Sequence, residues 1–329
     1  MNMQSWWMTL DASGSTLEQR TVPVPQPGPQ QLLVRMHAAS LNRGEFIAGH
    51  GLHGAPGSWK AIGGEGAGEV VAVGAEVTGW QPGDRVMGRC AGAFAGHGLI
   101  DAAEALAVPA ALSWEQAASV PLVFLVVFDM LVLQGRLQPG EWLLINGVSS
   151  GVGVGALQLG KVLGARVIGT SGSAAKLERL KALGLDVGLA TRAADFAPQV
   201  MELTGQKGAN LVINSVGGSV FAENVRCMAF EGRLATVGYV DGVLHGDLDI
   251  EALHAKRLTL FGVSNKLRTK AQKAAAMPRF RAEVLPHLAS GAIVPLVDQV
   301  VDFADLPQAK AAMEAGAHTG KIVLRMSHP

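Results

Sequence analysis

Four glycines fall within nine residues, directly after a short apolar run that predicts a strand. They are Gly147, Gly151, Gly153 and Gly155, and the sequence after them predicts a helix over 153–163. Glycines between a strand and a helix let the backbone approach a diphosphate closely, and the first N–H groups of the helix point toward that anion. We therefore predict a dinucleotide site formed by Ser149, Ser150, Gly151, Val152 and Gly153.

The residues after the next predicted strand, 166–170, distinguish between the two nicotinamide dinucleotides. A carboxylate at this place accepts hydrogen bonds from the ribose 2′-hydroxyl of NAD. No carboxylate lies between Glu141 and Glu178. Hydroxyls and an ammonium stand there instead, and these bind a 2′-phosphate rather than repel it. We expect NADPH, with its 2′-phosphate held by Ser171, Ser173 and Lys176 and with Arg192 as a further candidate.

Tyr239 is the only tyrosine of the chain and follows a strand predicted at 233–238. Ligands of parallel α/β sheets bind beyond the carboxyl ends of the strands, where this side chain should lie. Its phenol can donate a hydrogen bond to an oxyanion, and its ring can stack on a substrate ring. We name Tyr239 as a candidate catalytic residue, with packing at the rim of the sheet as the alternative.

The composition limits the kinds of partner. The chain has 329 residues, of which 49% are hydrophobic, enough for two domains with sizeable cores. The formal net charge is zero and the basic residues form no block, so we expect no nucleic-acid partner. Two cysteines, Cys90 and Cys227, are too few for a Cys₄ zinc site, and we expect buried free thiols in a reducing compartment.

No segment predicts a membrane helix. The longest apolar run, Leu122–Phe128, ends at Asp129 and is far shorter than the roughly 20 residues that span a bilayer. We expect it to form part of a buried helix. The first basic residue is Arg20, so no signal peptide is predicted. We expect a soluble, cytoplasmic protein with no membrane partner.

Two kinds of sequence pattern divide the chain. The first part is β-rich, with apolar runs at 30–42 and 64–77 and a turn at 82–84 that precedes a strand. After Ser113, a predicted helix N-cap, strands and helices alternate, which predicts an α/β fold with a doubly wound parallel sheet. Strands are predicted at 142–146, 166–170, 211–215, 233–238 and 258–263, and helices at 153–163, 174–183, 196–204 and 220–228. The remainder predicts helix, strand, helix and a closing strand at 320–326.

Six segments together resemble the zinc-independent quinone oxidoreductases of the medium-chain dehydrogenase/reductase superfamily, in the family's order and over nearly the whole chain. They are ASLNRGEFIAGHG from Ala39, IGGEGAGEVVAVGAEVTGWQPGDRVMG from Ile62, LQPGEWLLINGVSSGVGVGALQLGKVLGARVIGTSGSAAK from Leu137, NLVINSVGG from Asn210, GRLATVGYVDG from Gly232 and HTGKIVL from His318. The resemblance implies a GroES-like β-rich catalytic domain in two pieces, 1–122 and 267–329. A Rossmann NADP-binding domain at 123–266 would separate them.

The resemblance also implies an activity and its site. Such enzymes transfer hydride from NADPH to a small quinone or α,β-unsaturated carbonyl in a cleft, and many are homodimers joined through the last Rossmann strand, here 258–263. It makes Asn42 a catalytic candidate, because a neutral amide can donate to an oxyanion. Arg43 and Asn265 are weaker candidates, and the final proton is expected from water. Backbone and side chains near the nicotinamide would be Val216, Gly238, Tyr239, Val240, Gly262, Val263 and Ser264.

Several positions depart from the family pattern. The phosphate turn is commonly AxxGxxG, and its three places carry Gly147, Ser150 and Gly153. A Thr and a Tyr expected near the nicotinamide are Val126 and Phe128, and a Tyr near the 2′-phosphate is Thr191. Zinc-dependent relatives place a Cys near 40–46 and a His beside the next Glu, where this chain has Asn42 and Gly64. Only Glu65 is retained, while His37, His50, His53 and His97 are scattered, so we expect no metal.

Two other functions stay open. An enoyl-thioester reductase would need a basic groove for phosphopantetheine or coenzyme A, for which Lys266, Arg268, Lys270 and Lys273 are candidates unless they form a solvated helix face. A non-catalytic NADPH-binding protein is the second alternative, because a fold alone does not prove activity. The glycine-rich loop 48–59 is expected to be mobile and to border the substrate cleft, and its small residues indicate no substrate.

Overall fold

The computed structural model describes residues 1–11, 14–46 and 57–326. It divides into two compact units: unit 1 contains Met1–Val123 and Asn265–Pro329, and unit 2 contains Phe124–Ser264. Most of the glycine-rich loop expected at 48–59, including His50 and His53, lies outside the described residues.

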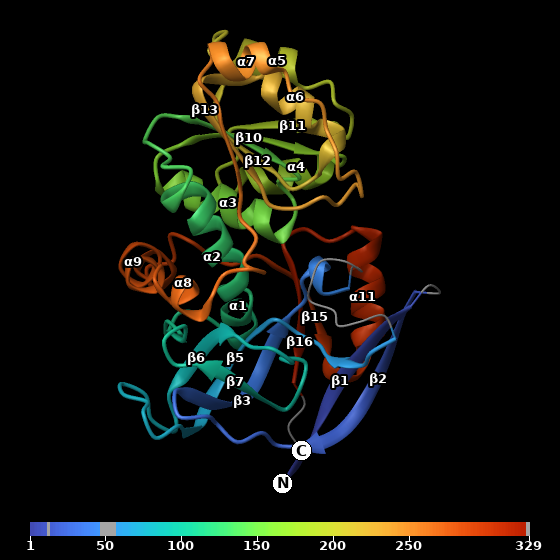
Figure 1. Cartoon of the computed structure of the whole chain (residues 1–329), viewed down its shortest axis with the longest axis vertical. Helices are drawn as coiled ribbons and strands as arrows, with labels where there is room; N and C mark the ends of the chain where they lie inside the picture. The colour runs from blue at the N-terminus through green and yellow to red at the C-terminus, as the bar shows by residue number, and fades with distance from the viewer. Residues whose placement is uncertain (12–13, 47–56, 327–329) are drawn as a thin grey trace. The chain divides into compact units, whose positions relative to one another are not determined.

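Unit 1 contains a seven-stranded sheet in which distant chain segments are neighbours (Figure 1). The strand order is β15-β16-β3-β5-β6-β8, and β7 pairs with β3 off this path. The strands are β3 (Gln31–Ser40), β5 (Glu65–Val73), β6 (Arg85–Arg89), β7 (His97–Asp101), β8 (Leu106–Ala107), β15 (Val297–Asp302) and β16 (Lys321–Arg325). Because β16 runs antiparallel to β3, with Val323 opposite Ser40, the C-terminal strand lies within the sheet of the N-terminal part.

A second, three-stranded sheet of unit 1 consists of β2 (Gly14–Pro23), β1 (Asn2–Asp11) and β4 (Lys60–Ala61). β1 and β2 form a long antiparallel hairpin. Apolar runs predict strands only from residue 30, because exposed polar residues interrupt β2. The hairpin is therefore an additional element that the sequence patterns did not predict.

Unit 1 also contains α-helices that flank its sheets. They are α1 (Trp114–Ala118), α8 (Lys270–Ala274), α9 (Met277–Glu283), α10 (Leu285–Ala289) and α11 (Leu306–Ala315). The predicted N-cap is confirmed, because the Ser113 side chain accepts from the Gln116 N–H in a capping box. The apolar run 122–128 lies in helix α2 (Pro121–Phe128) and is buried apart from the half-buried Leu122, which confirms the predicted buried helix.

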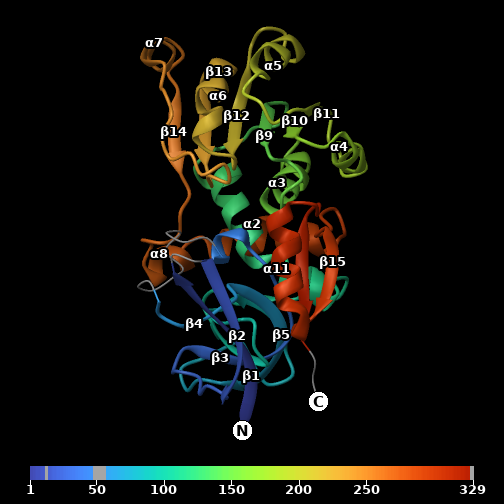
Figure 2. The ribbon, with the colours of Figure 1, turned by 90° about the vertical axis from the view of Figure 1, so that its right-hand side faces the viewer.

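Unit 2 is a six-stranded parallel sheet in the order β11-β10-β9-β12-β13-β14. The strands are β9 (Trp142–Asn146), β10 (Arg166–Ser171), β11 (Val187–Ala190), β12 (Ala209–Asn214), β13 (Met228–Thr236) and β14 (Thr259–Gly262). Helices α3 (Gly151–Val162), α4 (Ala174–Lys181), α5 (Ala197–Leu203), α6 (Phe221–Arg226) and α7 (Ile250–Ala255) connect them, and Figure 2 shows β14 at one edge. The predicted combination of a β-rich, GroES-like part with a doubly wound Rossmann sheet is confirmed.

Several element boundaries differ from the prediction by a few residues, and two of these differences have local reasons. Helix α3 begins at Gly151 rather than 153, because the Ser150 side chain accepts from the Gly153 N–H and so fixes an earlier start. Strand β13 covers 228–236 rather than 233–238, because Met228 already pairs with Ala209 before a register shift. The residues at 237–238 therefore belong to the loop beyond the sheet.

Both cysteines are buried free thiols, as predicted: Cys90 is 1% exposed and Cys227 0%. Burial raises the pKa of each thiol to about 12. At neutral pH both are therefore protonated and poor nucleophiles.

Candidate functional site

The parallel register of unit 2 aligns the carboxyl ends of its strands. Asn146 of β9 lies opposite Thr170 of β10 and Asn214 of β12, and Thr236 of β13 lies opposite Asn214 and Gly262. The predicted cofactor residues lie at these strand ends and at the end of β11, or in the loop or the first helical turn that follows. The order of the strands reverses between β9 and β12, and ligands of such sheets bind at this place.

The glycine-rich turn connects β9 to α3 and leaves no room for a side chain at Gly153. Gly147 has a φ of +73°, which favours glycine. A Cβ added at Gly153 would lie 2.5 Å from the carbonyl oxygen of Gly147, so α3 can begin against the turn only with glycine there. The Ser150 side chain caps α3 by accepting from the Gly153 N–H. In the described chain the N–H groups of Gly151 and Val152 have no intrahelical acceptor. These two donors fit a diphosphate.

A second group of polar side chains surrounds the end of β10. The hydroxyls of Ser149 and Ser171 lie 3.3 Å apart, and Ser171 Oγ accepts from the Ser173 N–H at 3.3 Å. Ser173 caps α4 by accepting from the Lys176 N–H at 3.4 Å. The structure thus brings Ser149, Ser171 and Ser173 together, with Lys176 in the first turn of the following helix.

Arg192, which follows β11, lies over the same corner. A Cβ added at Gly172 would lie 2.0 Å from Arg192 Nε, so the guanidinium lies directly on the glycine between Ser171 and Ser173. Among the described residues the guanidinium has no hydrogen-bond or ion-pair partner. An exposed cation beside two hydroxyls fits a phosphate. Thr191, by contrast, donates its hydroxyl hydrogen to Asp195 at 2.8 Å.

The residues predicted near the nicotinamide follow β12, β13 and β14. Asn214 Oδ1 accepts from the Val216 N–H at 3.0 Å, which fixes the turn after β12. Tyr239 is half-buried and its carbonyl accepts from the Gly242 N–H at 3.0 Å. The remaining predicted positions range from buried to exposed: Val263 is buried, Gly238 is half-buried, and Val240, Gly262 and Ser264 are exposed.

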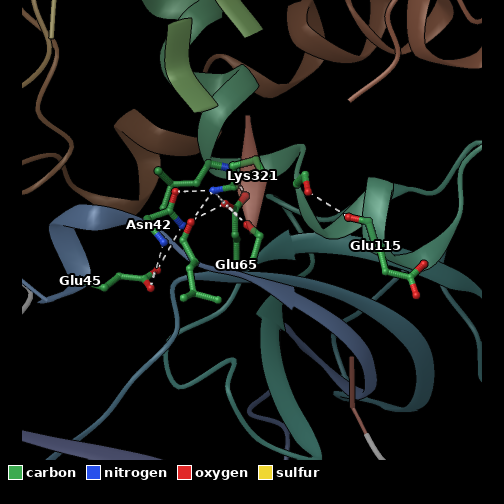
Figure 3. A network of polar contacts seen from close by, with 9 residues as sticks. Asn42, Glu45, Glu65, Glu115 and Lys321 are labelled. Atoms are coloured by element: carbon green, nitrogen blue, oxygen red, sulfur yellow. Dashed lines mark hydrogen bonds and ion pairs between the residues drawn. The ribbon is translucent and has the colours of Figure 1, made fainter. Parts of the chain in front are cut away.

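Unit 1 contains a network of buried charged and polar side chains at Asn42 (Figure 3). Glu65, at the start of β5, is 0% exposed and uses both carboxylate oxygens. Its Oε1 accepts from Ser40 Oγ at 2.6 Å, Asn42 Nδ2 at 2.9 Å and Lys321 Nζ at 3.0 Å. Its Oε2 accepts from the Leu122 N–H at 2.7 Å. Glu65 is therefore fully hydrogen-bonded as a carboxylate.

Lys321, the first residue of β16, supplies the balancing positive charge. Its ammonium donates to the Leu41 carbonyl at 2.8 Å, Asn42 Oδ1 at 2.7 Å and Glu65 Oε1 at 3.0 Å. These three acceptors match the three N–H groups of an ammonium. The ion pair can therefore stay charged although both side chains are almost entirely buried.

Glu45 lies in the 3₁₀ turn Arg43–Phe46 and is buried, yet it makes only long hydrogen bonds. Its carboxyl oxygens accept from the Asn42 backbone N–H at 3.3 Å and from Asn42 Nδ2 at 3.2 Å. Burial raises the pKa of the Glu45 carboxyl to about 7; Lys321 and Asn42 act to lower it, and Glu65 to raise it. Near neutral pH this carboxyl is thus about half protonated.

Asn42 occupies the centre of this network. Its amide nitrogen donates to Glu65 and Glu45, and its oxygen accepts from Lys321. The role of Asn42 as a donor to a substrate oxyanion stays a prediction, and it would require the 3.2 Å bond to Glu45 to be exchanged. Glu45 and Lys321 were not predicted from the sequence. Two features of the sequence could have indicated them. A glutamate follows Asn42 by three residues, and a lysine is the first residue of an otherwise apolar strand.

Gly64 explains why the Glu45 carboxyl can lie where it does. A Cβ added at Gly64, where zinc-dependent relatives place histidine, would lie 2.7 Å from Glu45 Oε1. Within the described residues, no group of three or more His, Cys, Asp or Glu could hold a metal ion. His37 stacks on Trp114 instead, with ring centroids 4.5 Å apart.

Two family models match the chain. The model of the alcohol dehydrogenase GroES-like domain matches residues 28–120, and that of the zinc-binding dehydrogenases matches residues 151–279. In the described part of the chain, no helix is long and apolar enough to cross a membrane.

Solved structures are similar over nearly the whole chain. A Pseudomonas syringae pv. Tomato quinone oxidoreductase is 30% identical, with a TM-score of 0.85 and coverage of 99% of this chain and 100% of that chain. The mycobacterial protein Rv1454c complexed with NADPH is 29% identical, with a TM-score of 0.87 and coverage of 98% and 99%. The CurK enoyl reductase is 25% identical, with a TM-score of 0.85 and coverage of 99% of both chains.

A curated relative is much longer than this chain. It is a phenolphthiocerol/phthiocerol polyketide synthase of Mycobacterium tuberculosis, which is 34% identical over 96% of this chain. The match covers only 15% of the synthase, so this chain corresponds to a small part of that protein.

Proposed function

We propose that this chain, which belongs to the medium-chain dehydrogenase/reductase superfamily, catalyses the NADPH-dependent reduction of a C=C bond conjugated to a carbonyl group. This proposal rests on one observation. The glycine-rich turn, the group formed by Ser171, Ser173 and Arg192, and the loop that contains Tyr239 all lie along one edge of the unit 2 sheet. Such an edge binds a dinucleotide in doubly wound folds.

The cofactor is NADPH, which supplies a hydride when bound. The residues present fit it: the N–H groups of Gly151 and Val152 would hold the diphosphate. Ser171, Ser173 and Arg192 would hold the 2′-phosphate, with Lys176 nearby, because none of these carries a negative charge. The NADPH complex of the similar mycobacterial protein Rv1454c supports the same choice.

The polar groups that act on the substrate would come from Asn42 and Tyr239. Reduction of a conjugated C=C bond places negative charge on the carbonyl oxygen, and a positioned N–H or O–H stabilises that charge. The amide of Asn42 is held by Glu65 and Lys321. Its orientation is therefore fixed before substrate binds, which lowers the cost of reorganisation.

The substrate is a quinone or a simple enone, and an enoyl thioester is a second candidate. Similarity to the Pseudomonas syringae quinone oxidoreductase supports the first. The thioester is favoured by similarity to the CurK enoyl reductase and to part of a polyketide synthase. All three substrate types contain a C=C bond conjugated to a carbonyl, so the same residues would serve each.

A substrate panel tests this proposal. NADPH absorbance is followed with a benzoquinone, a simple enone and crotonyl-CoA, and the products are identified by mass. We expect turnover of at least one of these with saturation of its C=C bond or formation of a hydroquinone. Turnover of the thioester alone would select the second candidate. Tight NADPH binding without any turnover would contradict catalysis and support a binding function.

We also propose a homodimer paired through the outer edge of β14. That strand ends the sheet of unit 2, so one side of its backbone pairs with no other strand among the described residues. An unprotected edge can add a strand from a second copy. Sedimentation equilibrium of the purified protein tests this, and a monomer at all concentrations would contradict it.

A further inference from the structure

The buried network at Asn42 contains three ionisable side chains but only one positive charge. Glu45 and Glu65 are 4% and 0% exposed, and Lys321 is 6% exposed. A buried charge without a partner is costly, because burial removes its hydration. One ammonium can balance one carboxylate, so the second carboxyl group is expected to carry a proton.

Hydrogen bonds identify which carboxyl is neutral. Glu65 accepts four bonds of 2.6–3.0 Å, including one from the Lys321 ammonium. From the described residues Glu45 accepts only two, at 3.2 and 3.3 Å, both from Asn42. All three N–H groups of Lys321 point to acceptors other than Glu45. The hydrogen bonds therefore stabilise the charged form more strongly at Glu65 than at Glu45.

Among the described residues, few charged groups surround Glu45. Glu65 of β5 and Lys321 of β16 are the charged groups that act on its carboxyl. Arg43, in the same turn, donates away from it to the Met313 carbonyl of α11 at 2.6 Å. Gly64, which carries no side chain and is half-buried, also lies against the carboxyl. The Leu122 side chain lies close to the same place.

We propose that Glu45 is a proton donor of this enzyme: its carboxylic acid O–H donates to the carbonyl oxygen of the substrate. The proposal rests on the proposed reduction of a conjugated C=C bond. Glu45 would then supply the final proton, which the sequence alone led us to expect from water. Zinc-dependent relatives place a histidine ligand at the position of Gly64. The Glu45 carboxyl lies against this position and would take the place of that ligand.

Bound NADPH would supply a hydride to the β carbon of the substrate, and the C=C electron pair would move to form an enolate. The enolate oxygen takes the proton from Glu45, so the O–H bond of the acid breaks and a carboxylate remains. The resulting enol converts to the saturated carbonyl compound in water, and Glu45 regains a proton from solvent. A group that titrates close to the working pH is the best suited to this exchange.

Infrared spectroscopy tests the protonation state without substrate or cofactor. Wild-type protein and the E45Q variant are titrated between pH 5 and 9, and the C=O stretch of protonated carboxylic acids is followed. We expect a band that is present in wild type at pH 6, disappears as the pH rises through about 7, and is missing in E45Q. A wild type without the band, or an E45Q variant that keeps it, would overturn the proposal.

Kinetics test the donor role. E45Q should lower kcat by roughly 100-fold and remove the fall of kcat above neutral pH, since general acids typically contribute 10²–10⁴-fold. Glu69→Gln is the matched control, because Glu69 lies on β5 and pairs with Arg35 at 3.0 Å, outside the network. A purely structural role would lower kcat without changing the pH profile. E45D, which keeps the acid, should retain the alkaline fall and serves if E45Q does not fold.

The two proposals fail in different ways. A wild-type protein that reduces no acceptor overturns the proposed function and, with it, the donor role of Glu45. An E45Q variant that turns over with an unchanged pH profile overturns only the role of Glu45.

Discussion

Lys321 Nζ lies 3.0 Å from Glu65 Oε1, although 256 residues separate the two positions along the chain. Both side chains are almost entirely buried, so each is the main counter-ion of the other. This pair holds the Asn42 amide between a carboxylate and an ammonium. The geometry of the unit 1 site therefore depends on contact between the two distant pieces of that unit.

Removing the ammonium should destabilise the protein strongly. Lys321→Met leaves Glu65 as an uncompensated buried charge, which typically costs about 3–5 kcal/mol. Urea unfolding followed by circular dichroism measures the loss. Lys181→Met is the control, because Lys181 and Glu178 form an exposed pair with side-chain exposures of 59% and 72%; exposed pairs contribute about 1 kcal/mol or less. Equal losses in the two variants would contradict the buried role.

Glu45 should make the stability depend on pH. Its pKa rises from an ordinary 4.5 to about 7 on folding. Between these values the native chain holds a proton that the unfolded chain has lost, so raising the pH favours unfolding. The change corresponds to roughly 3 kcal/mol, present below pH 4.5 and lost by about pH 7. Unfolding at pH 5 and pH 8 should show this loss in wild type relative to E45Q, and parallel pH dependences would contradict it.

Arg192 should select NADPH over NADH. Its guanidinium lies on Gly172 between two serines, so Arg192→Ala removes a partner of the 2′-phosphate but of no group in NADH. We expect roughly 10- to 100-fold weaker NADPH binding by calorimetry, as one or two charge-assisted hydrogen bonds are lost, with NADH unchanged. Lys181→Ala on α4 is the control. Lys176→Ala should act in the same direction, and equal losses for both coenzymes would exclude the phosphate role.

Gly153 should tolerate no side chain. Gly153→Ala would place a Cβ 2.5 Å from the Gly147 carbonyl oxygen, so the turn or the start of α3 must move. Overpacking of this kind costs about 1–3 kcal/mol, and we expect NADPH binding to weaken as well. Gly262→Ala is the stability control, since a Cβ there meets nothing within 4 Å. A Gly153→Ala variant as stable as Gly262→Ala would contradict the close packing.

Tyr239→Phe distinguishes hydrogen bonding by the phenol O–H from stacking by the ring. If the phenol donates to the substrate oxygen, kcat should fall roughly tenfold with little change in KM, as expected for a bond made mainly in the transition state. If the ring only stacks, Tyr239→Phe should keep full activity and Tyr239→Ala should raise KM. A Tyr239→Ala variant with unchanged kinetics would remove Tyr239 from the site.

Local patterns were sufficient for much of unit 2. The strand at 142–146, the glycine turn and the helix after it are consecutive, so their order and composition predict the site of a diphosphate. The parallel pairing of neighbouring strands then brings Arg192 against Gly172, next to Ser171. The binding of a phosphate by Arg192 stays a prediction.

Unit 1 was predicted less completely, because its site depends on contacts that sequence spacing does not contain. Nothing near Glu65 in sequence shows that Lys321 is its partner, since this depends on β16 pairing with β3. Glu45 resembles any exposed glutamate of a turn, and its burial follows only from the packing around Gly64 and Asn42. Burial and charge balance, which need coordinates, decide its chemistry.

The position of β16 beside β3 has a consequence for biosynthesis. Glu65 leaves the ribosome 256 residues before Lys321, an interval of about 10–50 s at the usual elongation rates. All six strands of unit 2 are made within that interval. The nascent chain thus carries a carboxylate whose counter-ion has not yet been translated, and the Asn42 network can form only after the last strand has emerged.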